Sequence, residues 1–168
     1  QSMSGDADVG TSAFTAQGGS IAAQAGDLFY VTNTHSVISL SGVALTLANE
    51  NLLTVAGNNA SRGWGQAGAN GGQVEFVAEG QELSGNITVD EISTLAFTLA
   101  KGSSFTGLIQ IVPNAEGGEA VSNNVVVTIE EGCTWTLTGD AAITSLTNNG
   151  TLNCNGHTLT LADGTVIQ

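Results

Sequence analysis

The sequence contains very little positive charge. Two basic residues, Arg62 and Lys101, stand against 15 acidic ones, and the formal net charge is −13. Nucleic-acid phosphates are bound through surfaces rich in lysine and arginine, so we expect no nucleic-acid partner. An anionic membrane surface would repel the chain. No run of ~18 apolar residues is present, so we expect no membrane insertion either.

Proline and charge are also scarce. Proline occurs once, at Pro113, and charged residues make up 10% of the chain, so Ser, Thr, Asn, Gly and Gln must form most of the surface. This composition resembles that of secreted bacterial surface β-proteins, and we expect an extracellular or cell-surface location. The 41% apolar content of the 168 residues is enough for one domain with a core or for a short solenoid.

The stretch from Val74 to Ile111 contains an internal repeat. Four apolar or glycine positions recur 22 residues later: Gly80 as Gly102, Leu83 as Phe105, Gly85 as Gly107 and Ile87 as Ile109. A stretched third copy is readable in Val125, Gly132, Trp135, Gly139 and Ile143. A fixed period of this length indicates a repeat architecture.

Each repeat consists of short alternating strands separated by glycine or asparagine, with no helix-length apolar pattern. The sequence therefore predicts an all-β protein, a parallel β-helix or β-solenoid of about six or seven rungs with about 22 residues per rung. A β-sandwich is the weaker alternative, because it gives no reason for the repeat. We treat 1–168 as one domain, with 1–12 as an irregular or edge segment. Seven side chains are expected to stack inside: Phe76, Phe97, Leu99, Phe105, Trp135, Leu137 and Leu159.

Two stretches interrupt the repeat, at 56–73 and 112–124, and long insertions of this kind are usually functional or disordered. The first contains four residues suited to sugar binding: Arg62, Trp64, Gln66 and Asn70. An aromatic ring stacks on the C–H face of a sugar, while amides and arginine hold its hydroxyls or carboxylate. The alternative is that Trp64 folds back to cap a rung and Arg62 pairs with a local acid.

Carboxylates at the corners, which the stacking of rungs would bring together, are candidate calcium ligands. The candidates are Asp90 or Glu91 with Glu116 or Glu119. No zinc-site or EF-hand spacing is present. The alternative is that these carboxylates are solvated corner residues.

Catalysis is poorly supported by the residues available. A polysaccharide lyase needs a strong base, and Lys101 lies at a repeat corner where its counterpart in the preceding unit is Glu79. A hydrolase needs paired acids at a set separation, and the neighbours Asp90 and Glu91 should point apart. No serine–histidine–aspartate grouping is indicated. We expect a protein that is not an enzyme.

The two cysteines, Cys133 and Cys154, lie 21 positions apart, close to one rung. At equivalent positions on adjacent rungs their Cα atoms would be ~4.8 Å apart, which a disulfide allows. The alternative is a pair of stacked, buried thiols.

Five segments of the sequence are distinctive: Gly26–Thr34, Val43–Leu47, Asn51–Leu53, the Gly63-Trp64-Gly65…Asn70-Gly71-Gly72 loop and Leu83–Asp90. Together they closely resemble the latter part of the secreted carbohydrate-binding-domain proteins of clostridia and related gut bacteria. The resemblance covers most of the chain, about residues 13–165. It implies a right-handed parallel β-helix, some members of which are associated with acidic plant polysaccharides such as pectin and with calcium.

The residues and the resemblance together predict a non-catalytic, extracellular polysaccharide-binding module. The main alternative is a structural or adhesive solenoid that stacks end to end as a homo-oligomer, because an open β-helix exposes unpaired backbone at both ends. A polysaccharide lyase or hydrolase is the third hypothesis.

Overall fold

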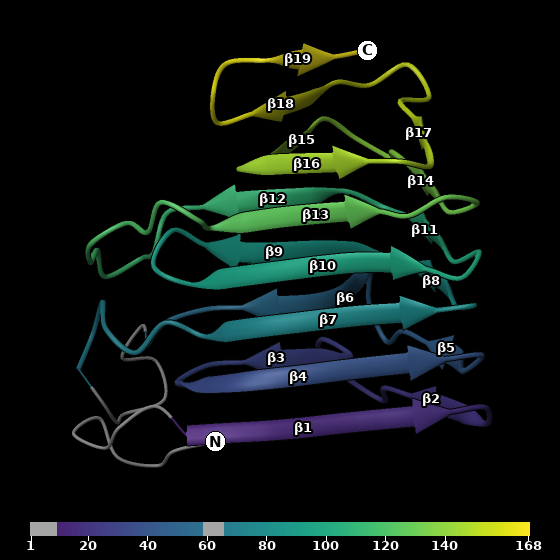
Figure 1. Ribbon diagram of the computed structural model, residues 1–168. Coiled ribbons are helices and arrows are strands. Elements are labelled where there is room, and N and C mark those ends of the chain that lie inside the picture. Colours follow the sequence, from purple (N-terminus) through teal and green to yellow (C-terminus); the bar gives the residue numbers. More distant parts are fainter. Residues whose placement is uncertain (1–9, 59–65) are drawn as a thin grey trace.

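The computed structural model describes residues 10–58 and 66–168, and every regular element in this part of the chain is a β-strand (Figure 1). All but one of the strand pairs are parallel, and the exception lies at the C-terminal end. The prediction of an all-β protein is thereby confirmed. The described residues form no helix that is long and apolar enough to cross a membrane.

The largest sheet has six strands, and no two neighbours in it are consecutive in the chain. In spatial order its strands are β1 (Gly10–Gln17), β4 (Thr34–Ser41), β7 (Gln73–Glu79), β10 (Thr94–Ala100), β13 (Val125–Ile129) and β16 (Ser145–Asn148). We call it the front sheet, since it faces the viewer in Figure 1.

The remaining strands form two further sides of the molecule. The right side in Figure 1 contains β2 (Ser20–Ala22) paired with β5 (Ala44–Thr46), and a sheet of β8 (Glu82–Ser84), β11 (Ser104–Thr106), β14 (Thr134–Thr136) and β17 (Thr151–Asn153). The back contains a sheet of β3 (Phe29–Val31), β6 (Asn51–Val55), β9 (Asn86–Asp90) and β12 (Ile109–Val112), followed by β15 (Ala141–Ile143), β18 (Leu159–Leu161) and β19 (Val166–Ile167).

The chain visits the front, right and back sides in rotation. We call three consecutive strands, one on each side, a unit: β1 to β3 form the first unit and β4 to β6 the second. Parallel neighbours need a crossover connection. Here the two intervening strands supply it, so each front strand pairs with the front strand of the next unit.

The strand register confirms most of the predicted repeat. Phe105 lies opposite Leu83, and Ile109 lies opposite Ile87, both at the expected offset of 22. In the front sheet, however, Ala100 and not Lys101 lies opposite Glu79. The prediction that Lys101 is the counterpart of Glu79 was therefore wrong, because the corner after β10 has one residue more than the corner after β7.

Aromatic side chains run through the core from unit to unit. The ring centroids of Phe76 and Phe97 are 5.4 Å apart, those of Phe97 and Phe105 5.3 Å, and those of Phe105 and Trp135 5.9 Å. The Trp135 indole donates a hydrogen bond to the carbonyl oxygen of Gly107 at 3.0 Å, which satisfies its one polar atom. All seven predicted inward side chains are buried: Phe76, Phe97, Leu99, Phe105, Trp135, Leu137 and Leu159.

The two ends of the stack differ. At the C-terminal end β19 turns back and pairs antiparallel with β18, so it covers the edge of that back strand. At the other end β1 is the outermost strand of the front sheet among the described residues. Residues 1–9 of the predicted edge segment lie outside the described part of the chain.

Candidate functional site

Both predicted insertions leave the back of the molecule at the same corner. The first joins β6 to β7, and the second joins β12 to β13. Figure 1 shows the described parts of both on the left, beside the ends of the front strands. We call this region the insertion corner. It brings together two segments that are about fifty residues apart in the sequence.

The two insertions are packed against each other through glycine backbone. A Cβ added to Gly68 would lie 2.8 Å from the carbonyl oxygen of Gly117, which is closer than real Cβ contacts. Gly68 also has a φ of +70°, in the left-handed region that disfavours other residues. The contact therefore depends on glycine in the first insertion.

The carboxylate of Asp90 holds both insertions from the intervening unit. Its Oδ2 atom accepts a hydrogen bond from the Gly57 backbone N–H at 2.6 Å and another from the Asn114 side-chain amide at 2.6 Å. Asp90 is 4% exposed. Hydrogen bonds to a charged group contribute about 1.5–3 kcal/mol each, so this carboxylate is a main anchor of the corner.

Further hydrogen bonds fix the backbone of the corner. The Asn124 amide donates to the carbonyl oxygens of Asp90, at 2.8 Å, and of Ser93. The Ser93 hydroxyl accepts a hydrogen bond from the Gly72 N–H at 3.0 Å. Each bond joins the end of an insertion to the corner that follows β9. The described part of the insertion corner is thus a hydrogen-bonded structure.

Beside the insertion corner, the back sheet presents a row of polar side chains. Tyr30, Thr54, Thr88 and Gln110 lie opposite one another on β3, β6, β9 and β12, and we call them the back-sheet row. Tyr30 is 38% exposed. A hollow of about 170 Å³ lies between this row and the insertion corner, lined by Thr54, Thr88, Gly57, Asp90, Pro113 and Asn114 among others.

The predicted sugar-binding residues are only partly described. Arg62 and Trp64 lie outside the described residues. Gln66 is exposed, and its carbonyl oxygen accepts a hydrogen bond from the Ala69 N–H at 3.2 Å. Asn70 is half-buried, and its carbonyl oxygen accepts a hydrogen bond from the Asn33 N–H at 3.0 Å. Asn70 therefore helps to attach the insertion to the corner that precedes β4.

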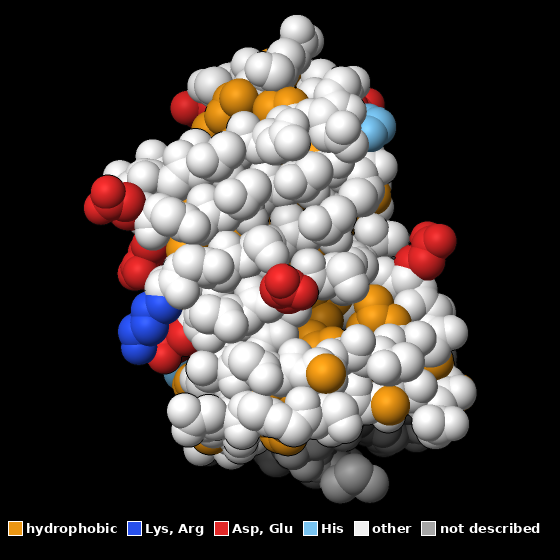
Figure 2. Space-filling model, turned by 90° about the vertical axis from the view of Figure 1, so that its right-hand side faces the viewer, with side chains coloured by type: hydrophobic (Ala, Val, Ile, Leu, Met, Phe, Trp, Pro, Cys, Tyr) orange, Lys and Arg blue, Asp and Glu red, His pale blue; other side chains and the backbone are white. Residues whose placement is uncertain are grey.

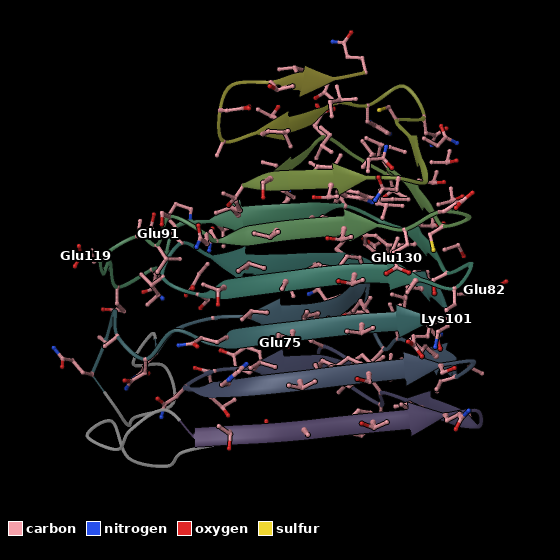
Figure 3. The ribbon with its side chains drawn as sticks, viewed as in Figure 1. Glu75, Glu82, Glu91, Lys101, Glu119 and Glu130 are labelled. Carbon is pink, nitrogen blue, oxygen red and sulfur yellow. The ribbon has the colours of Figure 1, made fainter. Side chains whose placement is uncertain are left out.

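The four predicted calcium ligands lie at or near the insertion corner. Glu91 is half-buried, and its Oε1 atom accepts a hydrogen bond from the Asn114 N–H at 3.4 Å. Glu116 and Glu119 are exposed on the second insertion, and Figure 3 shows Glu119 at its outer tip. Within residues 10–58 and 66–168, no three His, Cys, Asp or Glu side chains cluster closely enough to hold a metal ion. Calcium binding stays a prediction.

The residues weighed for catalysis lie in different places. Lys101 has a φ of +53° at the front–right corner, and its ammonium group lies 2.8 Å from Glu79 Oε2 (Figure 3). Asp90 is buried, in contrast to a solvated corner residue, whereas the neighbouring Glu91 is half-buried. His35 pairs with Glu75 on the front sheet at 3.1 Å.

The sequence left a Cys133–Cys154 disulfide and a pair of stacked, buried thiols as alternatives, and the structure does not place the two cysteines at equivalent positions. Both thiols are free. Trp135 lies opposite Leu152, at an offset of 17 residues and not 21. In this register Cys133 is level with Gly150, whereas Cys154 follows Asn153, which lies opposite Thr136. Cys133 is buried and Cys154 is half-buried.

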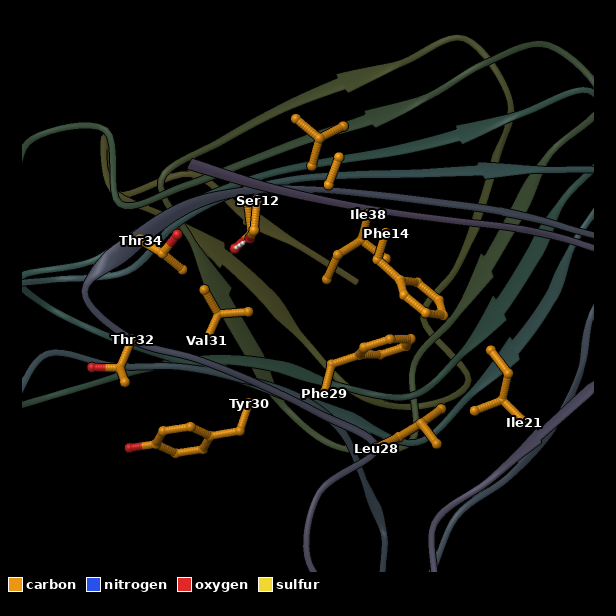
Figure 4. Close-up of a pocket in the computed structure, with 13 residues that line it drawn as sticks. Ser12, Phe14, Ile21, Leu28, Phe29, Tyr30, Val31, Thr32, Thr34 and Ile38 are labelled. Carbon is orange, nitrogen blue, oxygen red and sulfur yellow. Dashed lines mark hydrogen bonds between the residues drawn. The ribbon is translucent and has the colours of Figure 1, made fainter. Parts of the chain in front are cut away.

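A separate apolar hollow of about 400 Å³ opens at the first unit (Figure 4). Phe14 of β1 and Phe29 of β3 meet there edge to face, with ring centroids 5.6 Å apart. Phe14 is 43% exposed. The alternation of apolar and polar residues in the strands predicted neither this hollow nor the exposed Tyr30. Exposure in the first unit depends on which segments pair with its strands, and the alternation does not show this.

Two carboxyls near the C-terminal end have lowered pKa values. Hydrogen bonds from the Thr158 backbone N–H and hydroxyl lower the pKa of Asp140 below its ordinary value of 3.8. Thr165 lowers the pKa of Asp163 in the same way. Both are turn carboxylates that bind a backbone N–H. Their shifts reflect local structure at the last corners.

The chain was compared with protein-family models, curated proteins and solved structures, and none of them matches it.

Proposed function

We propose that this chain is a right-handed parallel β-helix of six turns that serves as an extracellular, non-catalytic polysaccharide-binding module. The rotation of the chain through three sides supports the β-helix. The proposed function is inferred mainly from the back-sheet row, which is flanked by two insertions that pack together. Linear polysaccharides suit such a site, because successive strands repeat similar side chains about every 4.8 Å.

The back-sheet row offers the groups that sugars require. The Tyr30 ring supplies an aromatic face for the C–H side of a pyranose, and its hydroxyl supplies a polar edge. The Thr54 and Thr88 hydroxyls and the Gln110 amide would hydrogen-bond sugar hydroxyls. The insertion corner closes one side of the row with Pro113 and Asn114.

We expect this face to bind an acidic polysaccharide such as pectin only when a cation bridges the protein and the polysaccharide. The chain's formal charge of −13 repels a polyuronate. Calcium prefers carboxylate and carbonyl oxygens, which Glu91, Glu116 and Glu119 would offer along the insertion corner. We therefore expect retention of polygalacturonate to require calcium.

Affinity electrophoresis on pectin, xylan and cellulose derivatives, each with calcium and with chelator, tests this proposal. Retardation by at least one polymer is expected. Tyr30→Ala should weaken it, whereas Tyr30→Phe, which keeps the ring, should retain most of it. Trp64→Ala tests whether the first insertion also takes part. Migration unchanged by every polymer would overturn the proposal.

End-to-end assembly is the second candidate, favoured by the exposed Phe14 and the apolar hollow beside the outermost described strand. The antiparallel β19 at the opposite end works against it, because that strand covers part of the surface a second copy would need. Electron microscopy at micromolar concentration separates the two. Fibres would support assembly, and isolated particles alone would contradict it.

A further inference from the structure

A second surface feature lies beside the corner formed by two of the repeated glycines. Gly85 and Gly107 follow β8 and β11, at the corner between the right and back sides. Their N–H groups donate to the carbonyl oxygens of Thr106 and Thr136, each at 3.0 Å, so successive units are in close contact here. A Cβ on Gly107 would collide with the carbonyl oxygen of Gly85. Side chains are thus excluded from the corner itself.

A groove of about 680 Å³ lies beside this corner and is lined in part by Gly85, and we call it the glycine groove. Leu47 of the second unit and Leu108 of the fourth are both half-buried and form part of its apolar surface. Thr138 of the fifth unit also lines it, so the groove crosses several units along the stack. Figure 2, which faces the right side, shows apolar side chains gathered in a hollow there.

The rim of the groove is polar and carries no positive charge. Glu50, Asn86 and Thr106 line it, together with other hydroxyl and amide residues. Lys101, the one Lys or Arg within the described ranges, lies at another corner, paired with Glu79. A polyuronate would meet Glu50 without a compensating cation, and a like charge close by is unfavourable.

The dimensions also restrict the ligand. The groove is open and continues from unit to unit at the strand spacing of about 4.8 Å, so it suits an extended chain. Apolar patches beside hydroxyls and amides match a sugar, which has C–H faces and a hydroxyl rim.

We propose that the glycine groove is a second ligand site, which binds a linear, neutral polysaccharide. The inference rests on the proposed function in that it assumes a polysaccharide ligand, but it uses a different face from the back-sheet row.

The test compares Ser84→Trp with Thr151→Trp in affinity electrophoresis. Ser84 is an exposed residue of β8 that lines the groove, and Thr151 is an exposed residue of β17 in the same sheet, away from it. Xylan and hydroxyethylcellulose serve as neutral polymers, and polygalacturonate with calcium as the acidic one. Ser84→Trp should lose at least tenfold in affinity for a neutral polymer and keep its retention on polygalacturonate. Thr151→Trp should behave as the wild type on both.

The outcomes separate the two proposals. Retention on polygalacturonate with none on either neutral polymer would overturn the glycine-groove site and leave the proposed function standing. Retention on no polymer would overturn both. Neutral-polymer binding that Ser84→Trp leaves unchanged would also overturn the groove site.

A ¹⁵N-labelled sample titrated with xylohexaose gives an independent readout. The backbone amide signals of Gly85, Asn86 and Thr106, which line the groove, should shift together. Shifts confined to Thr54 and Thr88 would place the neutral ligand on the back-sheet row and contradict the groove site.

Discussion

The side-chain amide of Asn114 donates a hydrogen bond to the buried carboxylate of Asp90 at 2.6 Å. The two residues are 24 positions apart, and Val112 lies opposite Asp90 in the register of the back sheet. The same carboxylate oxygen also binds the Gly57 N–H of the other insertion. One side chain therefore binds both insertions beside the back-sheet row.

Replacement of Asp90 tests the contribution of this side chain. Asp90→Ala would leave the Gly57 N–H and the Asn114 amide without their acceptor, so we expect a loss of about 3 kcal/mol in unfolding free energy. Asp90→Asn is the matched control, because its amide oxygen can accept both hydrogen bonds and no charge stays buried. Urea unfolding measures both variants. Equal losses in Ala and Asn would contradict the role given to the oxygen.

Gly68 offers a test of the contact between the insertions. Gly68→Ala introduces a Cβ into the space occupied by the Gly117 carbonyl, in addition to the strain of a left-handed backbone. Gly102→Ala isolates the second effect, since Gly102 has a φ of +78° and nothing within 4 Å of its would-be Cβ. The left-handed conformation alone costs about 1–2 kcal/mol. Gly68→Ala should be clearly more destabilising than Gly102→Ala in urea, and equal effects would mean that the insertions do not touch.

Asp140 makes the last corner sensitive to acid. Its folded pKa is lowered, chiefly by the Thr158 backbone N–H and then by the Thr158 hydroxyl. The stabilisation is complete above the ordinary pKa of 3.8 and is lost as the pH falls through the lower folded value. Thr158→Val removes the hydroxyl and keeps the backbone N–H, so NMR titration should show the pKa of Asp140 rising part of the way. An unchanged pKa would exclude the hydroxyl as a cause.

The cysteines should react as two independent thiols. Titration of the denatured, unreduced protein with a thiol reagent is expected to find both free. In the folded protein Cys133, which is 1% exposed, should react far more slowly than the half-buried Cys154. A denatured protein without reactive thiols would contradict the register of β14 and β17.

The sequence alone was sufficient to predict that the regular elements are β-strands and which side chains form the core. Inward positions such as Phe76 and Phe105 alternate with polar residues, and this alternation is local. The register after each corner depends on the length of that corner, which is not a local property. One additional residue in the corner at Lys101 moved it away from Glu79. A shorter fifth unit moved Cys154 away from Cys133. Corner length depends on backbone packing that the residue pattern does not encode.

The site was less accessible to sequence reasoning than the fold. The irregular period located both insertions, but it could not show that they meet or that Asp90 joins them. From the sequence alone, Asp90 could be interpreted as a solvated corner residue, because its partners Gly57 and Asn114 lie in other units. The back-sheet row and the glycine groove both arise from side chains that come together only when units stack.

Affinity electrophoresis of the wild type and of Tyr30→Ala on polygalacturonate in calcium decides whether the back-sheet row binds a polysaccharide. We predict that the wild type is retarded and that Tyr30→Ala, with an unchanged circular dichroism spectrum, is retarded much less. Equal retardation of the two proteins, or none of the wild type on any polysaccharide, would contradict this prediction.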